Sequence, residues 1–279
     1  MDWLAKLDRR WLFLCMGLAV IVPIVLGVDL APPASPNAHA IYDAVEALPA
    51  GSKVLVSCDY DPGSEAEIYP MNLAVFHHLA RKDCRIIITQ LWPQAGPLVI
   101  RALDNAYYTN SDGEATGKMY GKDVANLGYK TGGQILISKM LQSIRDAFPE
   151  DVNGTPVSEI PAMEGIAKLD DFDMFIILSA GTPGTKEWVQ QCQSRLGKPM
   201  ASGVTAVSAP DFFAYVNSGQ LIGLLGGLRG ASDYEKLVNV PGRGMAGMGS
   251  QLTGHLLIVF FILIGNVGYF LGRRKAGRA

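Results

Sequence analysis

The chain has 279 residues, of which 49% are hydrophobic and only 18% charged, with a formal net charge of −2 at pH 7. This length allows one sizeable core together with membrane segments. The slightly negative charge argues against a general nucleic-acid binder, which needs a basic face. Four cysteines without a CxxC spacing are too few for a disulfide scaffold and argue against a thiolate zinc site.

Two long apolar segments lie close to the ends of the chain. Residues 11–28 (WLFLCMGLAVIVPIVLGV) and 252–272 (LTGHLLIVFFILIGNVGYFLG) contain no Asp, Glu, Lys or Arg. Each approaches the roughly 20 residues that a helix needs to span a bilayer. Their terminal positions and basic flanks favour membrane helices over two buried core helices. We therefore predict transmembrane helices at 11–28 and 252–272.

Basic residues lie on the outer flanks of both segments, within residues 1–10 and 273–279. The positive-inside rule then places both termini in the cytoplasm and the middle of the chain outside it, in the periplasm or the extracellular space. A cleaved signal peptide is the competing interpretation, because Ala38-His39-Ala40 fits an AxA site. That site lies about a dozen residues beyond an unusually long apolar region, so we expect an uncleaved anchor.

Between the two segments, strand-like and helix-like patterns alternate. Continuous apolar runs predict buried strands, and apolar spacings of three and four predict helices. The strands are expected at 53–58, 85–91, 123–129, 172–181 and 199–208, and the helices at 40–48, 69–83, 96–108, 132–148 and 185–197. This order predicts an α/β fold with a Rossmann-like, doubly wound, mostly parallel sheet, in one domain over residues 29–240.

The loops at the carboxyl ends of the predicted strands form the candidate site, because open parallel sheets bind ligands there. Two of these loops, near residues 128 and 179, are rich in Gly, Ser and Thr and lead into helices, so their bare N–H groups could hold a phosphate or carboxylate. Neither contains a GxGxxG or GxxxxGK[ST] motif, and ordinary turns and helix caps use the same residues. No particular cofactor is indicated. The candidate ligand-binding residues are Asp59, Asp61, Lys130, Gly132, Gly133, Ser179, Gly181, Thr182 and Ser208.

Four carboxylates follow the first predicted strand, in the stretch DYDPGSEAE (59–67). They alternate as in some calcium loops, but the twelfth position of that pattern is Pro70 instead of glutamate. A general acid–base pair is a second interpretation. The DPG triplet at 61–63 is typical of a solvated turn before a helix, and we favour this interpretation, without a metal site.

Small residues recur every four positions before and within the second apolar segment. A Gly-rich segment at 241–251 leads into the span, and small-xxx-small stripes allow helices to approach closely. Asn266 lies deep in the span, where an unpaired amide is costly. We predict packing against another chain, with the chain's own first span as the alternative partner. The residues expected at this contact are Gly242, Ala246, Ser250, Gln251, Gly254, His255, Asn266, Gly268 and Gly272.

Taken together, these features predict a two-span membrane protein that displays an α/β domain outside the cytoplasm. Its expected role is that of a binding protein, sensor, scaffold or accessory subunit of a membrane complex, because no catalytic motif is evident. The expected partners are the lipid bilayer, further membrane chains or a second copy, and a small anionic ligand; no nucleic acid is expected. The alternative is a membrane-anchored enzyme that acts on an anionic substrate, with or without a metal ion.

Overall fold

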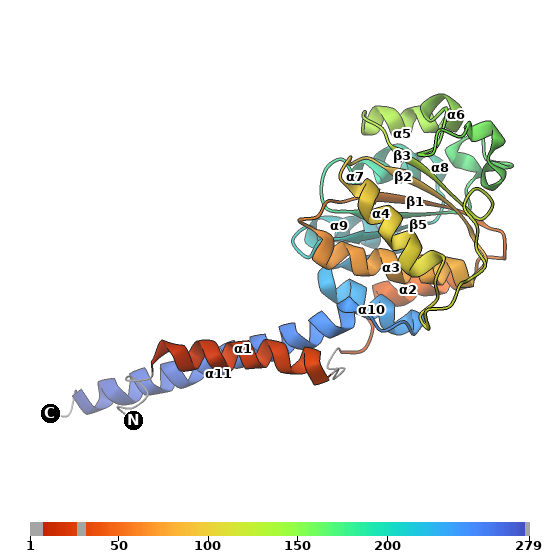
Figure 1. Ribbon diagram of the computed structural model, residues 1–279. Helices are drawn as coiled ribbons and strands as arrows, with labels where there is room; N and C mark the ends of the chain where they lie inside the picture. The colour runs from red at the N-terminus through yellow and green to blue at the C-terminus, as the bar shows by residue number, and fades with distance from the viewer. Residues whose placement is uncertain (1–7, 27–31, 277–279) are drawn as a thin grey trace. The chain divides into compact units, whose positions relative to one another are not determined.

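The computed structural model describes residues 8–26 and 32–276, with side chains as far as residue 270 (Figure 1). Parts of four predicted segments, residues 1–7, 27–28, 29–31 and 277–279, lie outside this description. Gly272 lies in a helix, but beyond the last described side chain. The chain divides into two compact units, of which one is residues 33–244 and the other contains the two apolar helices.

Six strands form one sheet in residues 33–244, and every neighbouring pair is parallel. The strand order is β3-β2-β1-β4-β5-β6. The α/β prediction with a parallel sheet is therefore confirmed, and each of the five predicted strands overlaps an observed one. The strands are β1 (Lys53–Asp59), β2 (Arg85–Gln90), β3 (Val124–Tyr129), β4 (Met174–Ser179), β5 (Met200–Val204) and β6 (Gly223–Gly226).

The sixth strand and the helix after it lie in a glycine-rich segment where the sequence predicted no regular element. Helix α10 (Gly227–Val238) directly follows β6. The glycines stand in the strand, at the junction and in the first helical turn, and the helix body beyond them contains none. At Gly230 a Cβ would lie 2.6 Å from the Leu225 carbonyl carbon, so glycine is required where the helix turns back onto the strand.

Helices cover both faces of the sheet (Figure 1). One face carries α2 (Pro36–Glu46), α3 (Glu65–Arg81), α4 (Ala95–Ala102) with a π-helical turn at Leu103–Tyr107, and α10. The other carries α5 (Gln134–Met140), α6 (Ile144–Ala147), α7 (Thr185–Trp188), which continues through a π-helical turn into α8 (Ser194–Leu196), and short 3₁₀ turns between 157 and 171. Helix α9 (Ala209–Asn217) contacts β6.

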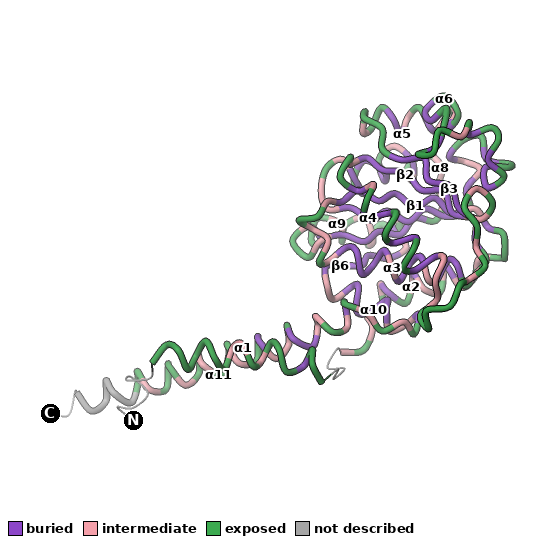
Figure 2. Tube along the Cα trace, in the orientation of Figure 1, coloured by how far each residue is buried: buried purple, intermediate pink, exposed green. Residues whose placement is uncertain are grey.

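The central strands are buried on both sides, as their continuous apolar sequences predicted (Figure 2). Along β1, Val54 and Val56 enter the core on the face that carries α3 and α4, whereas Leu55 enters the core on the opposite face. This alternation follows from the two-residue repeat of a strand. The sheet therefore holds its strand ends in fixed positions between two packed layers of helices.

The helix predicted at 132–148 is interrupted. Helix α5 ends at Met140 and α6 begins at Ile144, because the Ser143 hydroxyl accepts a hydrogen bond from the Asp146 N–H and caps a new helix. The Ile144 N–H donates to the Ala167 carbonyl instead of to the preceding turn. Ile135, an apolar residue of the predicted helix, is 78% exposed and lies in the first turn of α5.

The two apolar helices, α1 (Arg9–Leu26) and α11 (Arg243–Ala276), are long and apolar enough to cross a membrane. The Ser250 hydroxyl donates to the Val20 carbonyl at 2.8 Å, and the Thr253 hydroxyl donates to the Ala19 carbonyl at 2.5 Å. Residues later in α11 thus contact residues earlier in α1. The two helices run side by side in opposite directions (Figure 1).

The small-residue stripe has several different surroundings. Ser250 bonds to α1, and a Cβ at Gly254 would lie 4.0 Å from Met16 and Val20, so this part of the stripe contacts the chain's own first helix. At Gly242 a Cβ would meet the Glu235 carboxylate, and at Gly268 it would meet nothing within 4 Å. The remaining described members are exposed: Ala246, Gln251, His255 and Asn266. Association with another chain stays a prediction.

Candidate functional site

The six carboxyl ends of the strands lie along one edge of the sheet because all strands run in the same direction. The loops that follow β1, β3, β4 and β5 carry the residues that the sequence selected. In the structure these residues fall into groups with different surroundings. The surroundings of each residue determine whether it can reach a ligand.

At the end of β1, Asp59 is completely buried. Its Oδ1 accepts a hydrogen bond from the Leu91 N–H at 2.7 Å, and its Oδ2 accepts one from the Ser57 hydroxyl at 2.8 Å. The Trp188 indole N–H donates to the Ser57 oxygen at 3.1 Å. Asp59 therefore ties the end of β1 to the end of β2 and, through Ser57, to α7. It has no access to a ligand in this arrangement.

Burial raises the pKa of the Asp59 carboxyl to about 7. Removal from water disfavours the charged form, and the nearby Glu187 carboxylate disfavours it further. The hydrogen bonds from Leu91 and Ser57 act in the opposite direction but do not outweigh burial. The group thus changes charge near neutral pH, inside the fold.

The other three carboxylates of DYDPGSEAE also have partners within the chain. Asp61 accepts from the N–H and the hydroxyl of Ser64, at 3.0 and 2.8 Å, and forms the turn before α3. Glu65 pairs with Arg101, and Glu67 accepts from the Ala206 N–H at 2.7 Å. Nowhere in the described part of the chain do three or more His, Cys, Asp or Glu side chains gather in a way that could hold a metal ion.

The loop after β4 is held by a chain of buried hydroxyls. The Ser179 Oγ accepts from the Thr185 N–H at 3.1 Å and lies 2.7 Å from its hydroxyl, which lies 2.6 Å from that of Ser202. At Gly184 a Cβ would lie 2.4 Å from the Gly181 carbonyl oxygen, so only glycine fits there. Ser179 is thus part of the framework, while Thr182 is exposed at the rim.

The loop after β3 has a backbone that favours glycine. Gly132 has φ 128° and Gly133 has φ 47°, and a Cβ at Gly133 would lie 3.3 Å from the Pro183 side chain. The N–H groups of Thr131, Gly132 and Gly133 donate to no other group in the described residues. Lys130 is exposed, with its ammonium 5.8 Å from the centre of the Phe148 ring.

A pocket of about 380 Å³ lies where the loops after β2, β3 and β4 meet. Of the predicted ligand-binding residues, it brings together Gly132, Gly133 and Thr182. The other six predicted residues do not line it. Asp59 and Ser179 are buried in the framework, and Asp61 belongs to the turn before α3. Lys130 and Gly181 lie outside the lining, and the Ser208 hydroxyl accepts a hydrogen bond from the Thr205 hydroxyl. The lining residues are Leu91, Tyr129, Thr131, Gly132, Gly133, Gln134, Thr182, Pro183 and Glu187.

Glu187 is the functional candidate that the sequence did not reveal. It is only 5% exposed, lines the pocket, and accepts a hydrogen bond from the Gly184 N–H at 2.7 Å. A glutamate three residues after a helix cap is ordinary capping chemistry, so nothing in the sequence pattern distinguishes it as a ligand-binding residue. The one signal is its position behind GTPGT, the glycine-rich loop already selected. It is the only charged residue in the described lining.

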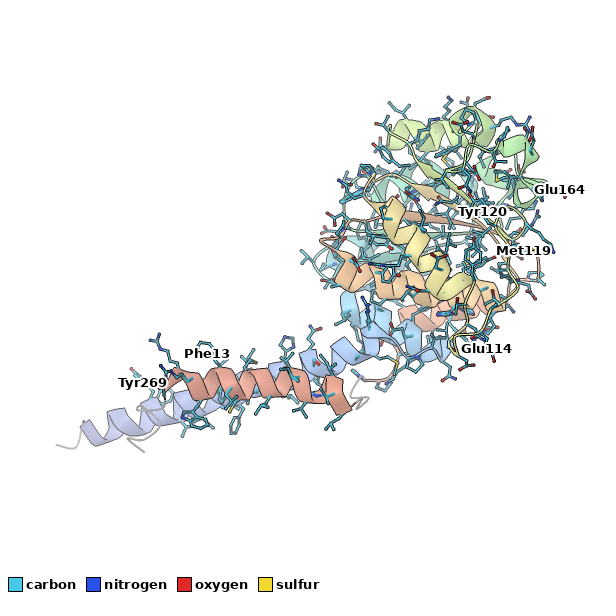
Figure 3. All side chains as sticks on the ribbon, in the orientation of Figure 1. Phe13, Glu114, Met119, Tyr120, Glu164 and Tyr269 are labelled. Atoms are coloured by element: carbon cyan, nitrogen blue, oxygen red, sulfur yellow. The ribbon has the colours of Figure 1, made fainter. Side chains whose placement is uncertain are left out.

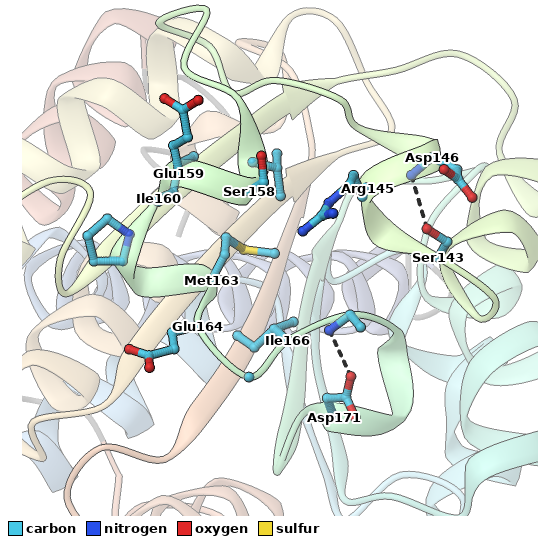
Figure 4. A pocket seen from close by; sticks show the side chains of 14 residues that line it. Ser143, Arg145, Asp146, Ser158, Glu159, Ile160, Met163, Glu164, Ile166 and Asp171 are labelled. Atoms are coloured by element: carbon cyan, nitrogen blue, oxygen red, sulfur yellow. Dashed lines mark hydrogen bonds between the residues drawn. The ribbon is translucent and has the colours of Figure 1, made fainter.

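A larger hollow, of about 930 Å³, lies at the opposite edge of the sheet (Figure 4). Its wall is the connection 143–171. Lys53, at the amino end of β1, donates a hydrogen bond to the Gly165 carbonyl, and Arg85, at the amino end of β2, donates one to the Glu164 carbonyl. Arg145 points into the hollow, but it is exposed, and no charged side chain of the described lining is buried. The smaller pocket, with its buried carboxylate, is the better candidate.

Comparison of the chain with protein-family models, with curated proteins and with solved structures finds no match. Geometry and chemistry alone therefore define the candidate site. Its pocket offers bare backbone donors, neutral hydroxyl and amide groups and one carboxylate, without a basic side chain in the described lining. Such a lining suits a small polar molecule that carries hydrogen-bond donors.

Proposed function

We propose that the protein is a two-span integral membrane protein whose α/β domain lies outside the cytoplasm and binds a small ligand. The observation that carries this proposal is the exposure of the apolar helices. Only 6% of each candidate span is buried, whereas a core helix of a soluble protein is mostly buried. Phe13 and Tyr269 project from the helix pair and are 73% and 63% exposed (Figure 3). A bilayer would cover such surfaces.

The pairing of α1 with α11 supports an uncleaved anchor over a signal peptide. Ser250 and Thr253 use their hydroxyls to bond α1 carbonyls, so removing α1 would leave these groups without partners in an apolar segment. The antiparallel pairing agrees with basic residues at the outer end of each helix, including Arg9 and Arg10. We therefore retain cytoplasmic termini and a periplasmic or extracellular domain.

The Rossmann-like classification is part of the same proposal. The order β3-β2-β1-β4-β5-β6 is that of doubly wound dinucleotide-binding folds, in which the direction of winding reverses between β1 and β4. Such folds bind ligands beyond the carboxyl ends of their strands, where the 380 Å³ pocket lies. A fold supports many activities, so the role as a binding or sensor protein rests on the pocket.

We also retain the proposed association with a second copy or with a membrane complex. His255 and Asn266 are exposed and stand eleven residues apart, which places them on one face of α11. An amide on a lipid-facing surface is costly without a hydrogen-bonding partner. Asn266→Leu should therefore weaken association, whereas Ser250→Leu would mainly disturb the pairing of α11 with α1. A wild-type mass in detergent equal to one chain would contradict the association.

A membrane-anchored enzyme is the second candidate, favoured by one observation. Asp59 carries a carboxyl whose pKa is raised to about 7 at the candidate edge of the sheet, and general acids and bases work best near the operating pH. This role requires the Leu91 loop to move, because Asp59 is sealed. If Asp59→Asn leaves ligand binding and turnover of every tested anionic substrate unchanged, the enzyme proposal has no basis.

Membrane insertion and sidedness can be tested in intact cells. We expect the chain to remain in the membrane after alkaline carbonate washing. Ser111→Cys, in an exposed loop of the α/β domain, should react with a membrane-impermeant maleimide when Cys15 is replaced by serine. The remaining cysteines, Cys58, Cys84 and Cys192, are buried and serve as the unreactive background. Release by carbonate, or labelling only after lysis, would contradict the proposal.

A further inference from the structure

The pocket at the carboxyl edge has two sides with opposite hydrogen-bonding character. On the β3 side, the N–H groups of Thr131, Gly132 and Gly133 have no acceptor in the described residues. On the β4 side stands the carboxylate of Glu187. Three adjacent residues with free N–H groups line the same pocket as one carboxylate, and this combination suits a molecule with a negative and a positive end.

Only one of the two oxygens of the Glu187 carboxylate accepts a hydrogen bond within the described residues. Its Oε2 accepts the Gly184 N–H at 2.7 Å, while Oε1 accepts no hydrogen bond from any residue that the structure describes. The side chain is 5% exposed, but Oε1 is not one of the sealed side-chain atoms without a partner in the described residues, so a ligand can reach it from the pocket. Because the described lining has no Lys, Arg or His, a cationic group of a ligand would be the natural partner.

The glycines on the other side keep their backbone accessible. Their φ values of 128° at Gly132 and 47° at Gly133 are ones that residues with side chains rarely adopt. A residue with a side chain is therefore disfavoured at both positions, and the backbone of Gly132 and Gly133 stays uncovered by any side chain of their own. Successive free N–H groups form a concave donor surface that binds anions such as carboxylates.

We propose that this pocket binds a free α-amino acid as its zwitterion, with the ammonium group on Glu187 and the carboxylate on the N–H groups of residues 131–133. The proposal rests on the proposed function, in which the domain binds a small ligand. A volume of about 380 Å³ falls within the range of small-molecule sites. A purely anionic ligand fits less well, because Glu187 would repel it and Lys130 does not line the pocket.

The first test uses the full-length protein in detergent and the twenty L-amino acids, each at millimolar concentration. We expect at least one of them to raise the melting temperature and to show saturable heat in titration calorimetry. For that amino acid, the analogue without the amino group and the analogue without the carboxyl group should each bind at least tenfold more weakly. No binding by any amino acid, or equal binding by either analogue, would overturn the proposal.

The second test replaces the carboxylate alone. Glu187→Gln retains an acceptor oxygen for the Gly184 N–H but removes the charge, so we expect affinity to fall at least tenfold. Glu67→Gln is the matched control, because Glu67 also accepts a backbone N–H at 2.7 Å, from Ala206, but does not line the pocket. Affinity should be unchanged in this control. Equal affinity of Glu187→Gln and wild type would overturn the assignment.

The experiments distinguish three outcomes: a folding defect in the variant, failure of the amino-acid inference, and failure of the membrane proposal. If Glu187→Gln melts at a clearly lower temperature without ligand, the analogue comparison on the wild-type protein decides the question. A protein that resists carbonate washing but binds no amino acid contradicts only this inference. A protein that washes off the membrane contradicts the membrane proposal, whatever it binds.

Discussion

The loop after β1 and the loops after β3 and β4 lie at the same edge of the sheet but use their polar groups in different ways. All four carboxylates between 59 and 67 have partners inside the chain. In the other two loops, the N–H groups of 131–133 and one oxygen of Glu187 have none in the described residues. The acidic loop is thus a structural joint, and the nearly uncharged loops form the pocket. The charged loop is thus occupied by contacts within the chain, and the free hydrogen-bonding groups at this edge line the pocket.

The largest effect should come from removing the joint. Asp59→Ala would leave the Leu91 N–H and the Ser57 hydroxyl without their acceptor in the core. Each unsatisfied buried donor costs about 1–3 kcal/mol, so we expect a loss of roughly 2–6 kcal/mol in the free energy of unfolding at pH 5. Urea unfolding of the full chain in detergent, followed by tryptophan fluorescence, measures this loss. A change below about 0.5 kcal/mol, the usual surface effect, would show that the loop is not a joint.

The pH dependence of the free energy of unfolding tests the Asp59 carboxyl without replacing the side chain. The pKa of Asp59 is about 7 in the folded chain and near 3.8 when unfolded, so between these values only the folded state holds the proton. The stabilisation from this group is therefore complete below about pH 4 and is lost as the pH rises through 7. A shift of about three units corresponds to on the order of 4 kcal/mol.

Asp59→Asn isolates this contribution, because asparagine keeps an acceptor oxygen and cannot titrate. The stability of the wild type minus that of the variant should decrease between pH 4 and pH 8 and stay level above that. Other titrating groups cancel in the difference. A difference that increases with pH would mean that the folded chain prefers the charged carboxylate, and burial would then not control this group.

The sequence predicted the strands well, because buried parallel strands have continuous apolar runs such as KVLVSC. It missed β6, which is four residues long and contains two glycines. It also could not show that Ser143 would cap a second helix after α5, or that Leu91 would close over Asp59. Those outcomes depend on contacts between distant segments. Asp59 was assigned to the correct edge of the sheet, but its burial depends on the β2 loop, which its own sequence does not reveal.

The smallest effects on stability and on affinity are expected from replacing Lys130. They test whether a residue next to the pocket, but outside its lining, contributes to binding. The exposed ammonium lies 5.8 Å from the Phe148 ring centre, an interaction of about 0.5 kcal/mol at an exposed position. Lys130→Ala should therefore change the free energy of unfolding by about that amount. It should leave amino-acid affinity within about twofold of wild type, because Lys130 does not line the pocket. A tenfold loss of affinity, measured by calorimetry, would mean that the ammonium reaches the ligand. The loop after β3 would then bind anions through charge as well as through its bare backbone, as the sequence first suggested.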